Sequence, residues 1–394
     1  MKKQTQAIHL EYERRDAYDS LSVPVYNTLA YEFDNAAVMA EAFTDKIKAP
    51  DYSRVENPTV TNLERRVAAL TDAAHATAFN SGMAAISNTL MALAAQGKNI
   101  VTSKHLFGNT YALLVATLHR FGVKVRLRDL TNIEAVREAI DDDTCCVFLE
   151  ILTNPQLEVA DLKAISEVAH KKNVPLVVDS TVIPFTQFSA KSLGVDIEVV
   201  SSSKYVSGGA TSLGGLVIDY GTPYNGDFAK RLYGEMLFNF GAYMTPQVAY
   251  MQTIGLETLD ARYRVQSSNA LELAKKLRSL PQIKYVNYVG LEDNPYHELA
   301  QRQFGKTAGA MICIDLESKE ACFSFLNNLK LIHRATNLFD NRSLAIHPAS
   351  TIFGAFSESM RKSMDVKDTT IRLSIGLEDV DDLFEDIKQA VDSL

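Results

Sequence analysis

One stretch of the chain, residues 196–215, combines a lysine, hydroxyl side chains and glycines in an order that could support amine chemistry. Residues 197–200 (IEVV) predict a strand, and Lys204 follows shortly after its end. A lysine at such a strand end loses part of its hydration, which lowers the pKa of its amine and favours attachment to a carbonyl carbon. The hydroxyls of Ser201 and Ser203 could hydrogen-bond a phosphate. The alternative interpretation of this stretch is a solvated turn.

A carboxylate and a helix start occupy similar positions after other predicted strands. Residues 175–179 predict a strand that ends in Asp179, which could cap a turn or contact a pyridine nitrogen. Pyridoxal 5′-phosphate (PLP) needs such a carboxylate, because its protonated ring accepts the electrons of a substrate carbanion. Residues 80–83 (NSGM) lie between a predicted strand and a predicted helix, where exposed N–H groups could bind a small anion. Together with Lys204, these residues suit a PLP site.

The elements that would position these residues form a regular alternation from about residue 60 onward. Helical patterns at 61–70 and 83–95 are interspersed with strand patterns, which lie at 76–79, 100–102, 123–127, 145–149, 175–179 and 197–200. Such alternation predicts an α/β fold with a mostly parallel sheet and helices on both faces. Ligands in these sheets bind beyond the carboxyl ends of the strands, so Asp179 and Lys204 are expected at one edge.

The chain divides into three predicted regions. Residues 1–58 lack the alternating pattern and predict an N-terminal arm that contacts a neighbouring subunit. Residues 59–256 form the predicted PLP-binding domain. A long helical pattern over 248–280 leads into a smaller C-terminal α/β domain, residues 257–394.

Composition narrows the class of protein further. The 46% hydrophobic and 22% charged residues are ordinary for a globular protein, and the net charge of −8 argues against a nucleic-acid partner. No apolar run reaches the length of a signal peptide or a membrane span, so neither secretion nor a membrane is expected. The four cysteines lack zinc-ligand spacing, which predicts reduced thiols, no metal site and a cytoplasmic protein.

Nine segments, in order, resemble the Cys/Met-metabolism family of PLP-dependent enzymes. This family includes cystathionine synthases and lyases, methionine γ-lyase and O-acetylhomoserine sulfhydrylase. The matching segments span almost the whole chain: 52–58 (YSRVENP), 81–83 (SGM), 106–110 (LFGNT), 150–155 (EILTNP), 178–181 (VDST), 201–205 (SSSKY), 255–259 (GLETL), 346–351 (IHPAST) and 371–379 (IRLSIGLED). The resemblance implies PLP fold type I, similar to aspartate aminotransferase.

The resemblance also implies a role for each matching residue. Lys204 would carry PLP as a Schiff base and then move protons, Asp179 would pair with the pyridinium, and Phe107 would stack on the ring. The other cofactor contacts in the same chain would be Ser81, Gly82, Met83, Asn154, Thr181, Ser201 and Ser203.

Two further groups of residues are implied in the same way. Tyr52 and Arg54 would reach the phosphate of a neighbouring subunit, so an active homo-oligomer is expected, a tetramer by analogy with the family. Arg372 and Ser343 would bind the amino-acid substrate, with the guanidinium holding its carboxylate by two hydrogen bonds.

Phe107 is a departure from the family, which usually has a tyrosine at this position. An aromatic ring can still stack, but no phenol is present to protonate a leaving group. This favours γ-replacement, in which an O-acetyl or O-succinyl homoserine loses its carboxylate and a sulfur donor (sulfide, a thiol or a carrier) adds to give homocysteine. Residues 342–348 (RSLAIHP) also resemble the sulfhydrylases, and Asn109 stands where methionine γ-lyases commonly have a cysteine, although the chain is shorter than typical sulfhydrylases and lacks their mid-domain insertion.

Three alternatives remain open. Methionine γ-lyase or cystathionine γ-synthase activity could occur at the same site, and product analysis would separate them. A non-catalytic paralogue could keep the fold without the reaction, and a protein that stays colourless with PLP would favour that interpretation.

Overall fold

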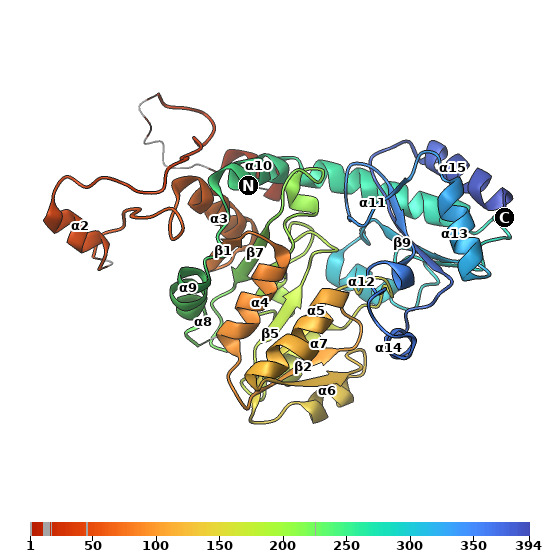
Figure 1. Cartoon of the computed structure of the whole chain (residues 1–394), viewed down its shortest axis with the longest axis horizontal. Helices are drawn as coiled ribbons and strands as arrows, with labels where there is room; N and C mark the ends of the chain where they lie inside the picture. The colour runs from red at the N-terminus through yellow and green to blue at the C-terminus, as the bar shows by residue number, and fades with distance from the viewer. Residues whose placement is uncertain (1, 11–15, 17, 45, 225) are drawn as a thin grey trace.

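A computed structural model describes residues 2–394 except 11–15, 17, 45 and 225. It shows an extended N-terminal segment, a large α/β domain and a smaller α/β domain (Figure 1). The predicted α/β class with a mostly parallel sheet is confirmed. No helix in the described part of the chain is long and apolar enough to cross a membrane.

The large sheet has seven strands in the order β1-β7-β6-β5-β4-β2-β3, and only β7 runs antiparallel to its neighbours. The strands are β1 (His75–Phe79), β2 (Asn99–Ser103), β3 (Lys124–Arg128), β4 (Thr144–Glu150), β5 (Leu176–Asp179), β6 (Ile197–Val200) and β7 (Gly215–Asp219). The sequence patterns predicted all but β7. That strand begins at Gly215, where a Cβ would lie 2.1 Å from the Ser81 carbonyl oxygen, so a glycine usually associated with loops is required by close packing.

Successive strand residues face opposite sides of this sheet and enter two apolar layers. Val178 packs in the layer that includes Leu63 of α3, whereas Val177 packs in the layer that includes Leu90 of α4. The helices of the large domain are α3 (Pro58–Thr71), α4 (Gly82–Leu93), α5 (Gly108–Ala112), α6 (Ile133–Ala139), α7 (Leu162–His170), α8 (Phe228–Arg231), α9 (Phe238–Phe240) and α10 (Pro246–Glu257). Both faces of the sheet are therefore covered.

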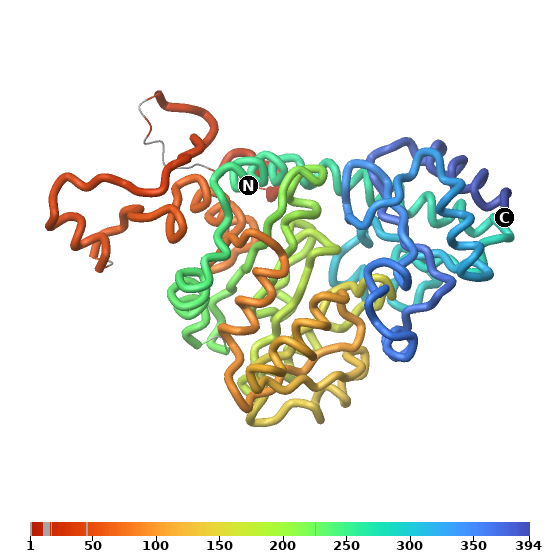
Figure 2. The backbone as a smooth tube through the Cα atoms, viewed as in Figure 1, coloured from red at the N-terminus to blue at the C-terminus, as the bar shows by residue number. Residues whose placement is uncertain are grey.

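The N-terminal segment contains two short helices with different surroundings. Helix α1 (Lys3–His9) contacts α3 and α10 of the large domain, and its Ala7 is buried there. Helix α2 (Ala36–Ala42) lies at the far end of an extended trace that leaves the body of the molecule (Figure 2). Only the second part of the predicted arm therefore projects away from the core.

Two helices occupy the stretch for which the sequence predicted one long helical pattern. Helix α10 ends at Glu257 and α11 spans Leu259–Leu277. The Arg262 guanidinium donates to the carbonyl of Gly255 at 2.6 Å and to that of Tyr205 at 2.8 Å. These bonds satisfy a carbonyl at the end of α10, which stabilises the break between the helices.

The smaller sheet has five strands in the order β10-β11-β12-β9-β8. They are β8 (Tyr285–Asn287), β9 (Met311–Asp315), β10 (His333–Arg334), β11 (Leu344–Ile346) and β12 (Thr370–Ser374), accompanied by α12 (His297–Phe304), α13 (Lys319–Asn328), α14 (Glu358–Ser363) and α15 (Val380–Asp392). One continuous apolar core includes Val178 of the large sheet and Leu373 of the small one, so the two domains pack directly together.

Candidate active site

The polar residues predicted to do chemistry follow strands that end at the same edge of the large sheet. Strands β4, β5 and β6 are parallel neighbours, and Glu150 pairs in register with Asp179 at the ends of β4 and β5. The residues after β6 include Ser201 and Lys204. The carboxyl ends of parallel strands thus bring an acid, a hydroxyl and an amine together.

The start of α4 and Ser201 form a cradle for a small anion. Ser81 caps α4 by accepting a hydrogen bond from the Ala84 amide at 3.2 Å, whereas the N–H groups of Gly82 and Met83 have no acceptor within the helix. A Cβ on Gly82 would lie 2.6 Å from the Ser201 Cβ, so only glycine allows this approach. The Ser201 amide donates to the Thr181 hydroxyl at 2.8 Å, which holds Ser201 in place. Such a cradle suits a phosphate.

Two carboxyl groups lie side by side next to this cradle. Burial raises the pKa of Asp179, although the Thr181 amide donates to its carboxylate at 2.9 Å. Burial and the neighbouring Asp179 raise the pKa of Glu150 to about 8. The Glu150 carboxyl accepts a hydrogen bond from the Phe107 amide and so places Phe107 beside this pair. A cation next to Asp179 would restore its charge.

Lys204 reaches out of the large domain to the small one. Its Nζ donates to the Oδ1 of Asn337 at 2.7 Å. Burial, together with the positive charge of Arg372, lowers the pKa of Lys204 to about 8. The amine is therefore partly neutral near physiological pH, as a nucleophile or a base must be.

Arg372 lies in β12 and is buried against both domains. One terminal nitrogen donates to the Oδ1 of Asn154 at 3.2 Å, and the other donates to the carbonyls of Thr336 at 3.2 Å and Asn337 at 3.3 Å. Burial lowers the pKa of Arg372 to about 10. Its Nε is buried and has no hydrogen-bond partner within the described residues, so the guanidinium can still donate to a bound carboxylate.

Four other predicted site residues have contacts of their own in this structure. The Ser203 hydroxyl donates to the Gly214 carbonyl at 3.1 Å and accepts from its amide at 2.9 Å. The Ser343 hydroxyl donates to the Glu378 carboxylate at 2.8 Å. Tyr52 is exposed, and Arg54 donates to the carbonyl of Phe238. The cofactor and substrate roles of these four residues stay predictions.

Sequence reasoning did not single out two residues that take part in the site. Glu150 belongs to the matched segment 150–155, but the residues next to it in the sequence do not reveal that it lies beside Asp179. That position follows from the pairing of β4 with β5. Asn337 lies in an irregular loop after β10 that matched no family segment. Local patterns cannot reveal a residue whose role comes from a contact 133 positions away.

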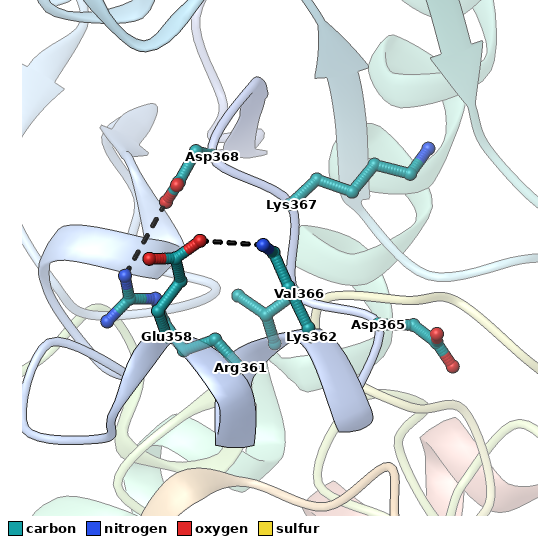
Figure 3. Close-up of a pocket in the computed structure, with 7 residues that line it drawn as sticks. All are labelled: Glu358, Arg361, Lys362, Asp365, Val366, Lys367 and Asp368. Carbon is teal, nitrogen blue, oxygen red and sulfur yellow. Dashed lines mark ion pairs between the residues drawn. The ribbon is translucent and has the colours of Figure 1, made fainter.

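A separate charged hollow of about 300 Å³ lies on the small domain around α14 (Figure 3). Its charged side chains are paired: Lys362 with Glu358 at 2.6 Å, Arg361 with Asp368 at 3.9 Å and Lys367 with Asp315 at 2.8 Å. Pairing leaves these groups little capacity for catalysis.

The residues present fit PLP. The cradle that a Gly82 Cβ would fill suits its phosphate, the carboxyl of Asp179 suits its pyridinium, and the desolvated Lys204 suits its aldehyde. Phe107, Asn154 and Thr181 lie on the loops that surround these three groups. Fold and site together define a PLP-dependent enzyme of fold type I.

Residues 4–392 match the family model described as Cys/Met metabolism PLP-dependent enzyme, and the chain belongs to this family. The chain is 37% identical to the L-methionine γ-lyase of Fusobacterium nucleatum subsp. polymorphum, over 99% of this chain and 98% of that one. It is 31% identical to the O-acetyl-L-homoserine sulfhydrylase of Corynebacterium glutamicum, over 98% and 95% of the two chains.

A solved structure supports the same assignment. The crystal structure of a putative O-acetylhomoserine (thiol)-lyase from Campylobacter jejuni, which contains a pyridoxyl-lysine phosphate residue, superposes with a TM-score of 0.95 at 35% identity. The match covers 100% of both chains. These relatives carry out γ-replacement or γ-elimination by their names, so the chain is a PLP-dependent enzyme of that group.

Proposed function

We propose that this enzyme catalyses γ-replacement: an O-acyl-homoserine loses its acyl group as a carboxylate, and a sulfur donor adds at the γ-carbon to give homocysteine. The observation that carries this proposal is Phe107, which has no hydroxyl to protonate a leaving group. A carboxylic acid has a pKa of about 4 and a thiol one of about 8.5, so a carboxylate departs without a proton far more readily than a thiolate.

Bound PLP would supply an electron sink for the carbanion at the substrate α-carbon. Arg372 would bind the substrate carboxylate through its buried guanidinium, which Asn154 already orients from the large domain. The Lys204 amine would remove the α-proton and then move a proton at the β-carbon. Burial and the charge of Arg372 lower the pKa of this amine to about 8. Its deprotonation near neutral pH therefore costs little free energy, and the neutral amine can act as a base.

Methionine γ-elimination is the second candidate, and the 37% identity to a methionine γ-lyase favours it. In that reaction a thiolate leaves, and the products are 2-oxobutanoate, ammonia and methanethiol. The pocket around the substrate γ-carbon would determine which acyl group and which sulfur donor the enzyme accepts. In our proposal Phe107 borders this pocket.

The deciding experiment supplies the purified holoenzyme with three substrate mixtures and measures homocysteine and 2-oxobutanoate together. The mixtures are O-acetylhomoserine with sulfide, O-acetylhomoserine alone and methionine alone, and O-succinylhomoserine repeats the first two. Homocysteine that depends on sulfide supports γ-replacement. Rapid 2-oxobutanoate from methionine, without homocysteine from the first mixture, would overturn it.

The proposal includes a cytoplasmic homo-oligomer, a tetramer, that acts in methionine biosynthesis. Large apolar side chains are exposed on the arm and near α9 and α10, and they include Leu29 at 65%, Phe43 at 59%, Phe240 at 58% and Ile254 at 48% exposure. Exposed apolar groups of this size, gathered on particular elements, are typical of protein interfaces. A second copy of this chain is the partner we propose.

A further inference from the structure

Asn337 contacts both cationic residues of the site. Its side-chain Oδ1 accepts a hydrogen bond from Lys204 Nζ at 2.7 Å, and its backbone carbonyl accepts one from Arg372 at 3.3 Å. The side chain and the main chain of one residue thus serve two different cations. Loss of the side chain would free Lys204 but leave the bond to Arg372 intact.

The loop that carries Asn337 is fixed by the same elements that carry those two cations. Phe339 stacks on Tyr205, the residue after Lys204, with ring centroids 4.0 Å apart and planes at 11°. The Phe339 amide donates to the hydroxyl of Ser374, two residues after Arg372, at 2.7 Å. Asn337 is therefore held in register with Lys204 and with Arg372 at once.

An amide suits the position next to Lys204 better than a carboxylate does. A charged lysine amine can donate hydrogen bonds but cannot accept them, so the amide group of Asn337 must present its oxygen to Lys204. This oxygen orients the amine without adding a negative charge, whereas a carboxylate would stabilise the protonated amine and raise its pKa. One N–H bonded to Oδ1 also restricts the directions in which the lone pair of a neutral amine can point.

The two cations are held in a reciprocal manner across the domain boundary. Lys204 of the large domain bonds to Asn337 of the small one, and Arg372 of the small domain bonds to Asn154 of the large one. Any ligand that engages the guanidinium of Arg372 therefore acts on the loop that holds the Lys204 amine. Substrate binding and amine orientation share one set of contacts.

We propose that Asn337 is a positioning residue: it orients the free amine of Lys204 for proton transfer at the substrate and links that orientation to Arg372. This inference rests on the proposed role of Lys204 as the cofactor lysine, but it holds for γ-replacement and γ-elimination alike.

The test compares the holoenzyme with Asn337→Ala, the isosteric Asn337→Asp and the control Asn328→Ala on α13. For Asn337→Ala we expect kcat to fall roughly 10- to 100-fold, because a small misplacement of a catalytic group has effects of this size, while KM stays within about twofold. For Asn337→Asp we expect the rising limb of the kcat–pH profile and the pH midpoint of the visible PLP band to move upward by about one pH unit or more. Asn328→Ala should match the wild type.

Each departure from these results has a definite meaning. A higher KM with unchanged kcat would show that Asn337 binds substrate and would overturn the positioning role, as would an unchanged Asn337→Ala enzyme. If Asn337→Ala fails to fold, the midpoint of the isosteric Asn337→Asp protein still decides the question, and an unmoved midpoint overturns the role. A wild-type protein that acquires no visible band with PLP would instead refute the role of Lys204 and the proposed function.

Discussion

Asp179 and Glu150 are neighbouring carboxyls at the ends of β5 and β4, and their different burial gives them different properties. Two like charges at adjacent strand ends disfavour joint ionisation. Glu150 is the more buried of the two, with its pKa raised to about 8, so it remains largely protonated at neutral pH. Asp179 is half-buried and is the carboxyl that a pyridinium would keep ionised. Glu150 then supports the site by holding the Phe107 amide.

Gly82 gives a direct test of the anion cradle. In Gly82→Ala the new Cβ would lie 2.6 Å from the Ser201 Cβ, so the helix start and Ser201 must separate. We expect PLP to bind roughly tenfold more weakly or worse, which corresponds to a loss of about 1.4 kcal/mol. Titration of the visible band with PLP measures this. Gly234→Ala is the matched control, because nothing lies within 4 Å of its Cβ. Equal PLP affinity in both variants would contradict the cradle.

Phe107 tests the choice of reaction. Phe107→Tyr supplies the missing phenol, and we expect 2-oxobutanoate formation from methionine to rise about tenfold or more relative to homocysteine formation, because general acids contribute at least this much when a poor leaving group departs. Product assays under identical conditions give the ratio. Phe107→Leu, which removes the ring, should slow both reactions. A ratio that does not change in Phe107→Tyr would show that protonation of the leaving group does not limit elimination.

At the scale of elements, the loop after β2 is tied to the small domain through His105. Its Nδ1 lies 2.5 Å from the Glu158 carboxylate, and its Nε2 lies 2.8 Å from that of Asp365, which also pairs with Lys104 at 2.6 Å. Burial opposes protonation of His105, but the bonds to Glu158 and Asp365 outweigh it and raise the pKa. The His105 ring therefore joins the loop that leads to Phe107 to the segment after α14.

This contact should make stability depend on pH. Because the folded pKa of His105 lies above the unfolded value of 6.5, its contribution is complete below that pH and is lost as the pH rises through the folded pKa. Asp365 is about half-exposed, so we expect a contribution on the order of 1 kcal/mol. Urea unfolding of the wild type should show this loss, and His105→Gln should not. His297→Gln is the control and should keep the dependence; a pH-independent wild type would refute the contact's role.

The sequence predicted those elements that show a regular local pattern. Strands β5 and β6 are short segments rich in valine, and polar residues stand at or directly after their ends, so the sequence alone places Asp179 and Lys204 at one sheet edge. Strand β7 was missed because it begins with Gly215, a residue type that usually indicates a loop but is required here by the close approach of Ser81. The break before α11 depends on a contact of Arg262 with Tyr205, which is distant in sequence. The contact of Asn337 with Lys204 depends on how the two domains pack.

At the scale of the whole molecule, the projecting arm argues for sites shared between subunits. Arg54 lies with its guanidinium 5.6 Å from the Tyr52 ring and donates to the carbonyl of Phe238 in α9. We propose, as the family resemblance implies, that these residues reach the phosphate of a neighbouring subunit, and the exposed apolar groups of the arm would be buried there. Each site would then need two chains.

Mixing inactive variants tests this arrangement. Arg54→Ala and Lys204→Ala should each be inactive, whereas co-expression should restore about a quarter of the sites, since half of random dimers are mixed and one of their two sites is intact. Specific activity of the purified mixture measures the recovery. Co-expression of Lys204→Ala with Asp179→Asn is the control, because both changes lie in the same chain's site and no intact site can form. A silent first mixture, with normal oligomers, would contradict shared sites.

Strand β12 lies in the middle of the small sheet, yet it is the last strand in the chain. All seven strands of the large sheet end before residue 220, so a nascent chain can complete the sheet that carries Asp179 and Lys204 while the small sheet still lacks its centre. Arg372 leaves the ribosome only with β12. During synthesis the sheet edge with Asp179 and Lys204 can therefore be complete well before Arg372 is in place, and under the roles that we propose the substrate carboxylate gains its partner only when the chain is almost finished.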